Sequence, residues 1–193
     1  MEKVMLFDGK DASKWRHRDG SECKWTVRNG CMTVKPGTGD IYCTENYSDA
    51  MLHVEFRCPD MPEASGQGKG NSGVYLHGCY EIQVLDSYEL EPMINGCGSL
   101  YCLATVLSNP SRPPMEWQTY DIIFRAPRFD EAGNITEKGR LTLLFNGECV
   151  HNNLELERTT PGGLSETIQQ SAPLLLQDHG NLVSFRNIWL VRL

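Results

Sequence analysis

Short runs of β-forming residues, separated by turn-forming residues, repeat along the whole chain. Val, Ile, Tyr, Phe and Trp fill these runs, and Gly, Pro, Asn and Asp stand between them. Two of the breaks are Asn29-Gly30 and Asn146-Gly147, the dipeptide typical of two-residue hairpin turns. No stretch carries a clear helical period. The sequence therefore predicts an all-β chain of about eleven to thirteen strands with almost no helix.

So many strands do not fit into one flat sheet. A twisted sheet system of this size closes into a barrel or splits into two packed sheets. We expect a jelly-roll β-sandwich of two antiparallel sheets. The length of 193 residues suits a single domain over residues 1–193. The last run is apolar on both faces from Ile188 onward, which predicts a strand buried in the middle of a sheet.

The stretch 70–86 reads as a glycine-rich loop, a strand, a tight turn and a second strand. On the first strand Tyr75 and His77 share a face, and on the second Glu81 and Gln83 share a face. The turn between the strands would bring these two polar faces together. This set of side chains favours the lining of a site, and the alternative is a solvent face without a function.

A second polar face lies on the run 51–57, where apolar and polar residues alternate. The apolar set is Leu52, Val54 and Phe56, and the polar set is His53, Glu55 and Arg57. In a half-buried strand the apolar set points inward, so the polar set points the other way. We expect this polar face to line the concave side of the same sheet as the face that carries Glu81.

The net charge limits the partners of the chain. The formal charge is -7 at pH 7, and the sequence pI is about 5.2. Nucleic acids and anionic membranes both require a basic surface, so neither is an expected partner. No apolar run approaches the roughly 20 residues of a membrane span. A small molecule is the expected ligand, and a homo-oligomer stays open beside a monomer.

Eight cysteines are spread along the chain without a CxxC motif. A chain of this size needs no disulfides to fold, so we expect free thiols rather than bridges or a cysteine metal site. Free thiols indicate a reducing compartment. The N-terminal residues carry no apolar stretch typical of a secretory signal. Together these features predict a cytoplasmic location.

A series of short motifs follows the order found in a known family. The motifs are 6–11 with Trp15, 25–30, 71–76, 80–86, 116–121, 176–180 and 185–189. On these motifs the chain resembles the 3-keto-disaccharide hydrolase family, also called domain of unknown function 1080, from about residue 4 to the C-terminus. The resemblance implies a concanavalin A-like jelly roll and activity on 3-keto glycosides. The chain departs from the family pattern at His77, where many members carry Arg, and at 99–102.

Glu81, Gln83 and Asp86 share the spacing of a catalytic strand in laminarinase-like enzymes, whose fold the family resembles. There, Glu-x-Asp-x-x-Glu carries the nucleophile and the general acid of a retaining glycosidase. In this chain the middle acid is Gln, and the last is the shorter Asp. A retaining mechanism needs two carboxyl groups about 5–5.5 Å apart, so this arrangement does not favour it.

A 3-keto sugar offers an easier reaction, because the ketone acidifies the proton on C2. One general base removes that proton, and the resulting enolate expels the substituent on C1; water adds later to complete a net hydrolysis. We expect Glu81 to be the base, with His77 and Asp86 as further catalytic candidates. Arg57, His77 and Tyr75 are candidates to stabilise the enolate oxygen.

A divalent cation could also stabilise the enolate oxygen, by bridging the ketone and the C2 hydroxyl. Ligand types are available at His53, Glu55, His77, Glu81, Asp86 and His179. No motif fixes a metal site among them, so the metal ligands stay unassigned and no cofactor is certain.

The candidate substrate-binding residues are Arg57, Glu55, His53, Asn71, Tyr75, Gln83, Tyr101 and His179. Structural alternatives stand beside them: Glu81 could pair with Arg57 across strands, and Asp86 could cap a turn. The predicted substrate is a small carbohydrate, and a separate sugar 3-dehydrogenase must make its ketone. Two other functions stay open: a non-catalytic sugar-binding module, and a conventional glycosidase that acts on unoxidised sugars.

Overall fold

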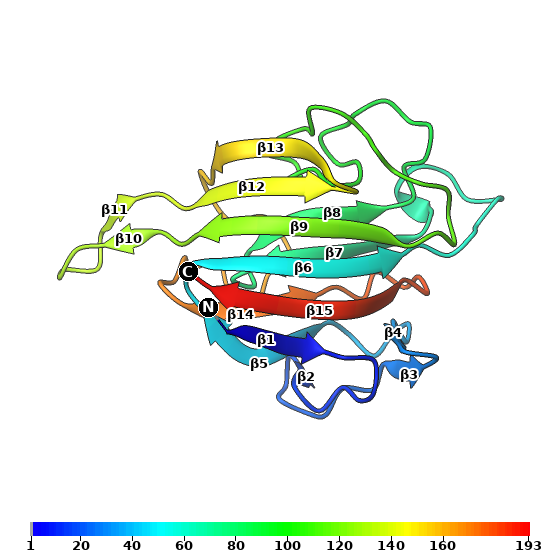
Figure 1. The fold of residues 1–193 in the computed structure, drawn as a ribbon, viewed down its shortest axis with the longest axis horizontal. Helices are drawn as coiled ribbons and strands as arrows, with labels where there is room; N and C mark the ends of the chain where they lie inside the picture. Colours follow the sequence, from blue (N-terminus) through cyan, green and yellow to red (C-terminus); the bar gives the residue numbers. More distant parts are fainter. Residues whose placement is uncertain (1) are drawn as a thin grey trace.

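Strands and the loops between them make up nearly all of the computed structural model, which describes residues 2–193 (Figure 1). In chain order the elements are β1 (Lys3–Phe7), β2 (Trp15–His17), β3 (Thr26–Arg28), β4 (Cys31–Thr33), β5 (Ile41–Tyr47), β6 (Ala50–Arg57), the 3-10 turn η1 (Gly66–Gly68), β7 (Asn71–Leu76), β8 (Tyr80–Leu85), β9 (Gln118–Arg125), β10 (Arg128–Phe129), β11 (Ile135–Glu137), β12 (Arg140–Phe145), β13 (Glu148–Glu155), β14 (Ala172–Leu176) and β15 (Ser184–Arg192). The expected number of strands was slightly low, because several strands have only two or three residues and leave little periodic signal.

The strands form two main antiparallel sheets. The larger sheet has eight strands in the order β13-β12-β9-β6-β15-β4-β3, with β1 paired to β15. The smaller sheet has five strands in the order β2-β5-β14-β7-β8, and β10 and β11 form a separate two-stranded hairpin. The small hairpin projects from one end of the molecule in Figure 1. The predicted β-sandwich of antiparallel sheets is therefore present.

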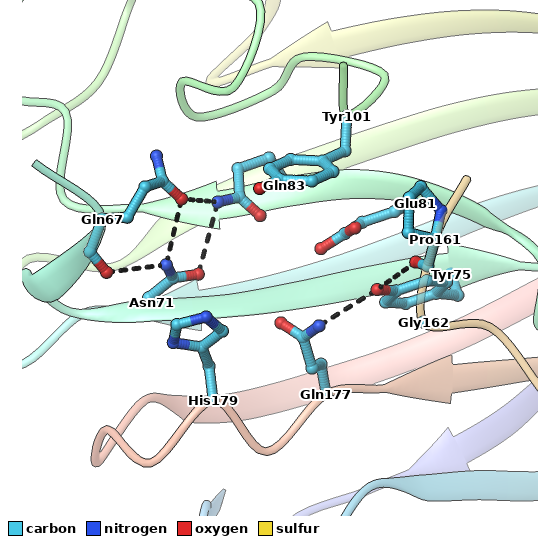
Figure 2. A pocket seen from close by; sticks show the side chains of 10 residues that line it. All are labelled: Gln67, Asn71, Tyr75, Glu81, Gln83, Tyr101, Pro161, Gly162, Gln177 and His179. Carbon is cyan, nitrogen blue, oxygen red and sulfur yellow. Dashed lines mark hydrogen bonds between the residues drawn. The ribbon is translucent and has the colours of Figure 1, made fainter. Parts of the chain in front are cut away.

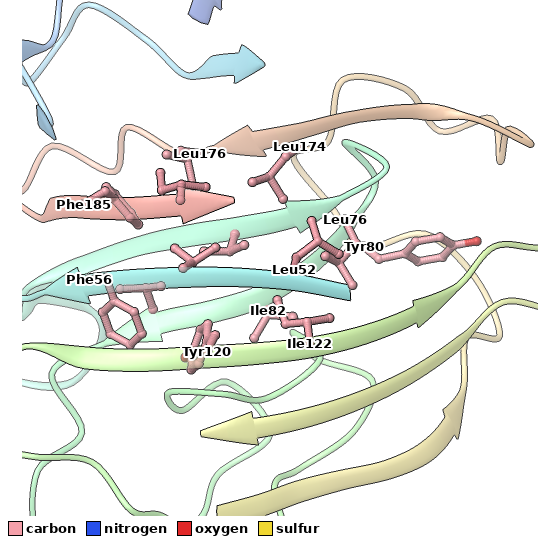
Figure 3. Packing of buried hydrophobic residues seen from close by; sticks show 14 of the residues in the cluster. Leu52, Phe56, Leu76, Tyr80, Ile82, Tyr120, Ile122, Leu174, Leu176 and Phe185 are labelled. Carbon is pink, nitrogen blue, oxygen red and sulfur yellow. The ribbon is translucent and has the colours of Figure 1, made fainter. Parts of the chain in front are cut away.

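The core lies between the two sheets and follows the alternation in the sequence (Figure 3). From the larger sheet it receives Leu52, Val54 and Phe56 of β6 and Tyr120, Ile122 and Phe124 of β9. From the smaller sheet it receives Val74, Leu76, Ile82, Val84, Leu174 and Leu176. All of these side chains are fully buried, and each contributes about 1.5–3 kcal/mol to folding when it is a Val, Leu, Ile or Phe.

Both Asn-Gly dipeptides form the predicted hairpin turns. Asn29 and Gly30 join β3 to β4, and Asn146 and Gly147 join β12 to β13. All four residues have positive φ angles, between 51° and 84°. This is the conformation that a two-residue type I′ turn requires, and it explains the choice of Asn and Gly.

Strand β15 lies inside the larger sheet, between β6 on one side and β4 and β1 on the other. The prediction of a central strand is correct, but only one of its faces is fully buried. Ile188 and Leu190 enter the core, whereas Trp189 and Val191 are only half-buried on the outer face. A register shift occurs around Asn187, whose φ is 46°.

The irregular segment between β8 and β9 adds to the edge of the smaller sheet. Its backbone at 98–101 exchanges hydrogen bonds with β8: the Gln83 N–H donates to the Ser99 carbonyl at 3.0 Å, and the Tyr101 N–H donates to the Glu81 carbonyl at 3.0 Å. The segment thereby places Tyr101 beside Glu81. Across residues 2–193, no helix has the length and apolar character needed to cross a membrane.

The eight cysteines all lie in the described part of the chain and are all free thiols. Five are buried, among them Cys43 in β5 and Cys97 beside the Tyr120 hydroxyl. The prediction of free thiols is confirmed, and small apolar packing explains most of these positions.

Candidate active site

A pocket of about 150 Å³ opens on the outer face of the smaller sheet, over β7 and β8 (Figure 2). We call it the inner pocket. Its lining is mostly polar and consists of Gln67, Asn71, Tyr75, Glu81, Gln83, Tyr101, Pro161, Gly162, Gln177 and His179. Six of the eleven predicted site residues are therefore brought together here, although they come from four separate segments.

The β7–β8 hairpin forms the floor of the inner pocket. Across the two strands Tyr75 pairs with Glu81, and Gly73 pairs with Gln83. These residues face outward because the residues between them enter the core. Gly73 leaves room for the carboxylate: a Cβ there would lie 2.5 Å from Glu81 Oε1 and 2.8 Å from the Tyr75 ring. The glycine is thus required by close approach rather than by its backbone angle.

Glu81 is the one carboxylic acid in the lining of the inner pocket. Glu81 is only 3% exposed to solvent. Burial raises the pKa of Glu81 from its ordinary 4.5 to about 7, the nearby Tyr75 hydroxyl lowers it in part, and the negative charge of Asp40 raises it further. A carboxyl group with this pKa exchanges its proton readily near neutral pH, as a general base must.

Three amide side chains form a network beside Glu81. The Asn71 amide donates to Gln67 Oε1 at 3.2 Å, and the Gln83 amide donates to the same oxygen at 3.1 Å. In the opposite orientation of its amide, Gln83 instead donates to Glu81 Oε1 and to the Ser72 carbonyl, each at 3.1 Å. Gln83 can therefore donate to the carboxylate of Glu81 or accept from its protonated form.

The Tyr75 hydroxyl lies at the other side of the pocket and is held by two partners. It donates to the Pro161 carbonyl at 3.1 Å and accepts from the Gln177 amide at 3.0 Å. Burial and the charge of Glu81 raise the pKa of Tyr75 far above its ordinary value, so the phenol stays neutral. The phenol thereby links the floor of the pocket to the wall at 161–162.

Arg18 binds the backbone of this wall through contacts that we call the Arg18 clasp. Its guanidinium donates to the carbonyls of Gly162 and Gly163, the latter at 2.8 Å. It also pairs with Asp40 at 2.6 Å, and Asp40 accepts from the Asp178 N–H at 2.8 Å. Loops distant in the sequence are thus joined at one edge of the inner pocket. The Arg18 side chain is 42% exposed and that of Asp40 is 14% exposed, so the carboxylate end of this ion pair is largely shielded from solvent.

Tyr101 and His179 lie at the rim. Figure 2 shows the Tyr101 ring over the Gln83 side of the pocket and His179 on the opposite side, below Asn71. His179 is exposed and stands two residues after Gln177, whose carbonyl accepts from Ser72 Oγ at 2.6 Å. Both rim residues can reach a ligand without disturbing the floor.

His77 does not share the face of Tyr75, so this part of the prediction is wrong. It lies in the β7–β8 turn with a φ of 49°, which breaks the strand alternation. Its ring packs against Phe124 and Tyr47, with ring centres 4.6 Å and 5.0 Å away. Burial lowers the pKa of His77, and neither ring nitrogen has a partner among the described residues.

Asp86 also lies outside the inner pocket. It follows the end of β8, is buried, and pairs with Lys69 Nζ at 2.9 Å. It also accepts from the Tyr88 N–H at 3.4 Å. The structural alternative for Asp86, the cap of a turn, agrees with its bond from the Tyr88 N–H, whereas its ion pair with Lys69 was not predicted. Its place outside the inner pocket gives no support to a catalytic role.

The polar face of β6 lies on the outer side of the other sheet, so the expectation that it shares a site with Glu81 is wrong. There His53 contacts Asp121 at 2.6 Å and stacks on Trp189. Glu55 accepts from Asn187 at 2.8 Å and pairs with Arg186. Arg57 lies over the ring of Trp117 at 4.8 Å. The alternation correctly predicted that these three side chains point outward, but not to which sheet their strand belongs.

Four lining residues were absent from the prediction: Gln67, Pro161, Gly162 and Gln177. All lie in loops. Gln67 stands in the long Pro/Gly-rich segment before β7, a kind of loop that often carries function. Gln177 is the second residue of the motif 176–180, and a Pro-Gly pair at 161–162 is a turn signal within a polar connection. These signals mark the loops, but not which side chains enter the pocket.

Residues 2–193 contain no cluster of three or more His, Cys, Asp or Glu side chains placed to hold a metal ion. In the inner pocket the ligand types are the Glu81 carboxylate, the His179 imidazole and the amide oxygens. A cation held there would need water or substrate oxygens to complete its shell.

Comparison with solved structures gives a near relative. A candidate glycosyl hydrolase from Parabacteroides distasonis is 36% identical, with a TM-score of 0.90 over 99% of this chain and 84% of the other. A second one from the same organism is 20% identical, with a TM-score of 0.74 over 99% and 94%. The carbohydrate binding module CBM66 from Bacillus subtilis, 13% identical, shares the fold at a TM-score of 0.50 over 91% and 94%. The jelly-roll prediction is confirmed.

A search of curated proteins found no match. A family model described as the 3-keto-alpha-glucoside-1,2-lyase-like domain matches residues 2–191, which confirms the resemblance found in the motifs. Together with the 36% identical relative, it indicates a carbohydrate-related activity of the hydrolase or lyase kind. The chain therefore belongs to the 3-keto-alpha-glucoside-1,2-lyase-like family.

Proposed function

We propose that this protein cleaves 3-keto glycosides, with Glu81 as the general base that removes the proton from C2. The observation that carries the proposal is a single buried carboxyl group, its pKa raised to about 7, in a pocket otherwise lined by amides and aromatic rings. The family description supports the substrate class. A pKa near the working pH gives a base that is about half ionised and strong enough to accept a carbon-bound proton.

The reaction proceeds in two stages. Glu81 takes the C2 proton, and the electron pair of the C2–H bond forms an enolate with its charge on O3. The carbonyl at C3 then re-forms, a double bond forms between C1 and C2, and the C1–O bond breaks. The leaving oxygen takes up the proton that Glu81 removed, which regenerates the carboxylate, and the product is a 3-keto glucal that keeps its C2 hydroxyl. Water then adds across C1 and C2 to give the free 3-keto sugar, which completes a net hydrolysis.

The enolate oxygen needs hydrogen-bond donors at the moment its charge develops. In the proposal the amide N–H groups of Asn71 and Gln83 supply them by exchanging their present acceptor, Gln67 Oε1, for the enolate oxygen. The Gln67 amide N–H donates to the Asn95 carbonyl at 2.9 Å and takes no part. This replaces the earlier assignment of Arg57 and His77, which lie elsewhere. Tyr75 has a positioning role, since its hydroxyl is already committed to Pro161 and Gln177.

A conventional retaining or inverting glycosidase is less well supported. Both mechanisms use a pair of carboxyl groups that flank the glycosidic bond. The inner pocket offers only Glu81, and Asp40 nearby is engaged by Arg18. The remaining alternative, a sugar-binding module without catalysis, gives no reason for a base with a pKa near 7.

The wider setting is also part of the proposal. The ketone at C3 must be made by a separate sugar 3-dehydrogenase, since an oxidation of that kind precedes the chemistry of Glu81. We place the reaction in the cytoplasm, which the eight free cysteines support. Cell fractionation with an antibody against the protein tests this, and recovery outside the cytoplasmic fraction would contradict it.

The test of the function is turnover of a 3-keto glucoside by wild type, Glu81→Gln and the control Glu91→Gln, an exposed acid. Mass spectrometry should detect the 3-keto glucal and then the free 3-keto sugar with wild type and the control. Glu81→Gln should lose at least about a hundredfold in rate, the lower range for a general base. Unchanged turnover in Glu81→Gln would refute the role of Glu81, and release of product from unoxidised aryl glycosides would favour a conventional glycosidase.

A further inference from the structure

A second cavity, which we call the outer groove, adjoins the inner pocket. It has a volume of about 510 Å³ and shares Tyr101, Pro161 and Gly162 with the inner pocket. The residues that belong only to the outer groove include Cys102, Leu103, Arg158, Thr159 and Glu166. The two cavities thus lie on either side of a divider formed by the Tyr101 ring and the backbone at 161–162.

The inner pocket by itself is small for a ligand site. Sites for small molecules usually enclose about 300–1,000 Å³. The inner pocket, at about 150 Å³, is below this range, whereas the outer groove alone reaches it. A glycoside consists of a ring and a substituent on C1, so it needs two adjoining spaces of this kind.

The divider is fixed in place rather than free to move aside. Thr160 accepts from the Glu81 N–H at 2.8 Å and donates to the Cys79 carbonyl at 3.2 Å. Gly163 packs so closely on the Gly78 carbonyl that a Cβ would lie 2.5 Å from it. With the Arg18 clasp on the other side, these contacts hold the divider against β8.

The wall of the outer groove carries groups suited to a hydroxylated ligand. Arg158 is exposed and makes no ion pair in the part of the chain that the structure describes, and the same is true of Glu166. Thr159 adds a hydroxyl, and Leu103 and the Tyr101 ring add apolar surface. An apolar face with a few polar groups is how proteins bind sugars and compounds of similar size.

We propose that the outer groove binds the C1 substituent of a 3-keto glycoside while the oxidised ring occupies the inner pocket. The inference rests on the proposed function. The substituent is a second sugar or a hydroxylated group of similar size, and it contacts Arg158, Thr159 and Tyr101. After the C1–O bond breaks, the protonated leaving group departs through the outer groove. Water enters by the same route and adds to C1 of the 3-keto glucal, which stays in the inner pocket.

The experiment compares methyl 3-keto glucoside with a 3-keto disaccharide on four proteins. These are wild type, Thr159→Trp, which fills the outer groove, Arg158→Ala, which removes its cation, and Arg28→Ala, an exposed arginine on β3. The wild-type kcat/KM should be at least about tenfold higher for the disaccharide, the lower range for a fitted contact. Both groove variants should reduce that ratio about tenfold, and Arg28→Ala should leave it unchanged. Equal efficiency on both substrates in wild type, or an equal loss on both in Thr159→Trp, would overturn the inference.

Binding to Glu81→Gln separates this inference from the proposed function. If wild type turns over neither substrate, the proposed function fails. The outer groove is then judged by calorimetry alone, where the disaccharide should bind at least about tenfold more tightly than the methyl glycoside. Equal affinity for the two ligands would overturn the outer groove as a binding site, whatever the turnover assay gives.

Discussion

Replacing Glu81 with Gln should stabilise the protein at pH 8 while it removes the proposed base. Glu81 is only 3% exposed, and burial raises its pKa from 4.5 to about 7. A carboxyl group with a higher pKa in the folded chain binds its proton more tightly when folded. Its contribution to the free energy of unfolding is fully present below pH 4.5 and is lost as the pH rises to about 7.

The size of the effect follows from the shift. A difference of about 2.5 pKa units, at 1.36 kcal/mol each, corresponds to about 3 kcal/mol. Gln has nearly the same shape, stays neutral at every pH and does not carry this penalty. The Glu81→Gln variant should therefore exceed wild type by about 3 kcal/mol at pH 8, but by less than about 1 kcal/mol at pH 5.

Urea unfolding of wild type, Glu81→Gln and Glu91→Gln at pH 5 and pH 8 tests this. The midpoint of Glu81→Gln should move upward at pH 8 with the slope of the transition unchanged, because only stability has changed. Glu91→Gln, on the exposed loop after β8, should follow wild type at both pH values. A gain that is absent at pH 8, or equal at both pH values, would show that the carboxyl group is not desolvated and would remove the main argument for its role.

Further predictions concern the rate and the walls of the inner pocket. The kcat/KM should fall about tenfold per pH unit below about pH 7, since Glu81 must be ionised to act; a flat profile down to pH 5 would contradict this. Gly73→Ala should lower kcat about a hundredfold and the free energy of unfolding by about 1–3 kcal/mol, because the added Cβ would displace the Glu81 carboxylate. Steady-state kinetics and urea unfolding measure the two effects, and full activity would refute the close contact. Arg18→Met should raise KM more than it lowers kcat, and it should speed hydrogen exchange of the backbone amides at 157–171, because the wall at Gly162 loses its bonds to Arg18. Unchanged hydrogen exchange would show that the Arg18 clasp is not needed to hold this wall.

The fold and half of the site followed from local patterns in the sequence. Alternation predicted which side chains of each strand face the core, and the Asn-Gly pairs predicted two hairpins. The short turn after β7 places Tyr75 opposite Glu81, so these residues could be brought together without any knowledge of distant contacts. Local pairing of this kind is encoded within about fifteen residues.

Most of the predictions that proved wrong depend on contacts between segments that are distant in the sequence. Strand alternation predicts which side chains face outward, but it does not predict which sheet a strand joins. Strand β6 pairs with β9 and β15 in the larger sheet, whereas β7 pairs with β8 and β14 in the smaller sheet. The loop between β6 and β7 carries the chain from one sheet to the other, which separates His53 from Glu81. The prediction for His77 was wrong for a different reason: the positive φ of this residue turns its side chain away from the strand pattern. Gln67 lies in the short turn η1 and Gln177 in a loop, where no sequence period indicates the direction of a side chain.

The order of strands also has a consequence for synthesis on the ribosome. Strand β6 is complete at Arg57, but its neighbour β15 begins only at Ser184, and β15 alone joins β6 to β4 and β1. A nascent chain therefore exposes one edge of β6, with free N–H and C=O groups, until nearly all of the larger sheet has been made. Such an edge can pair with another nascent chain, so slow translation of the last third should increase aggregation and the need for a chaperone.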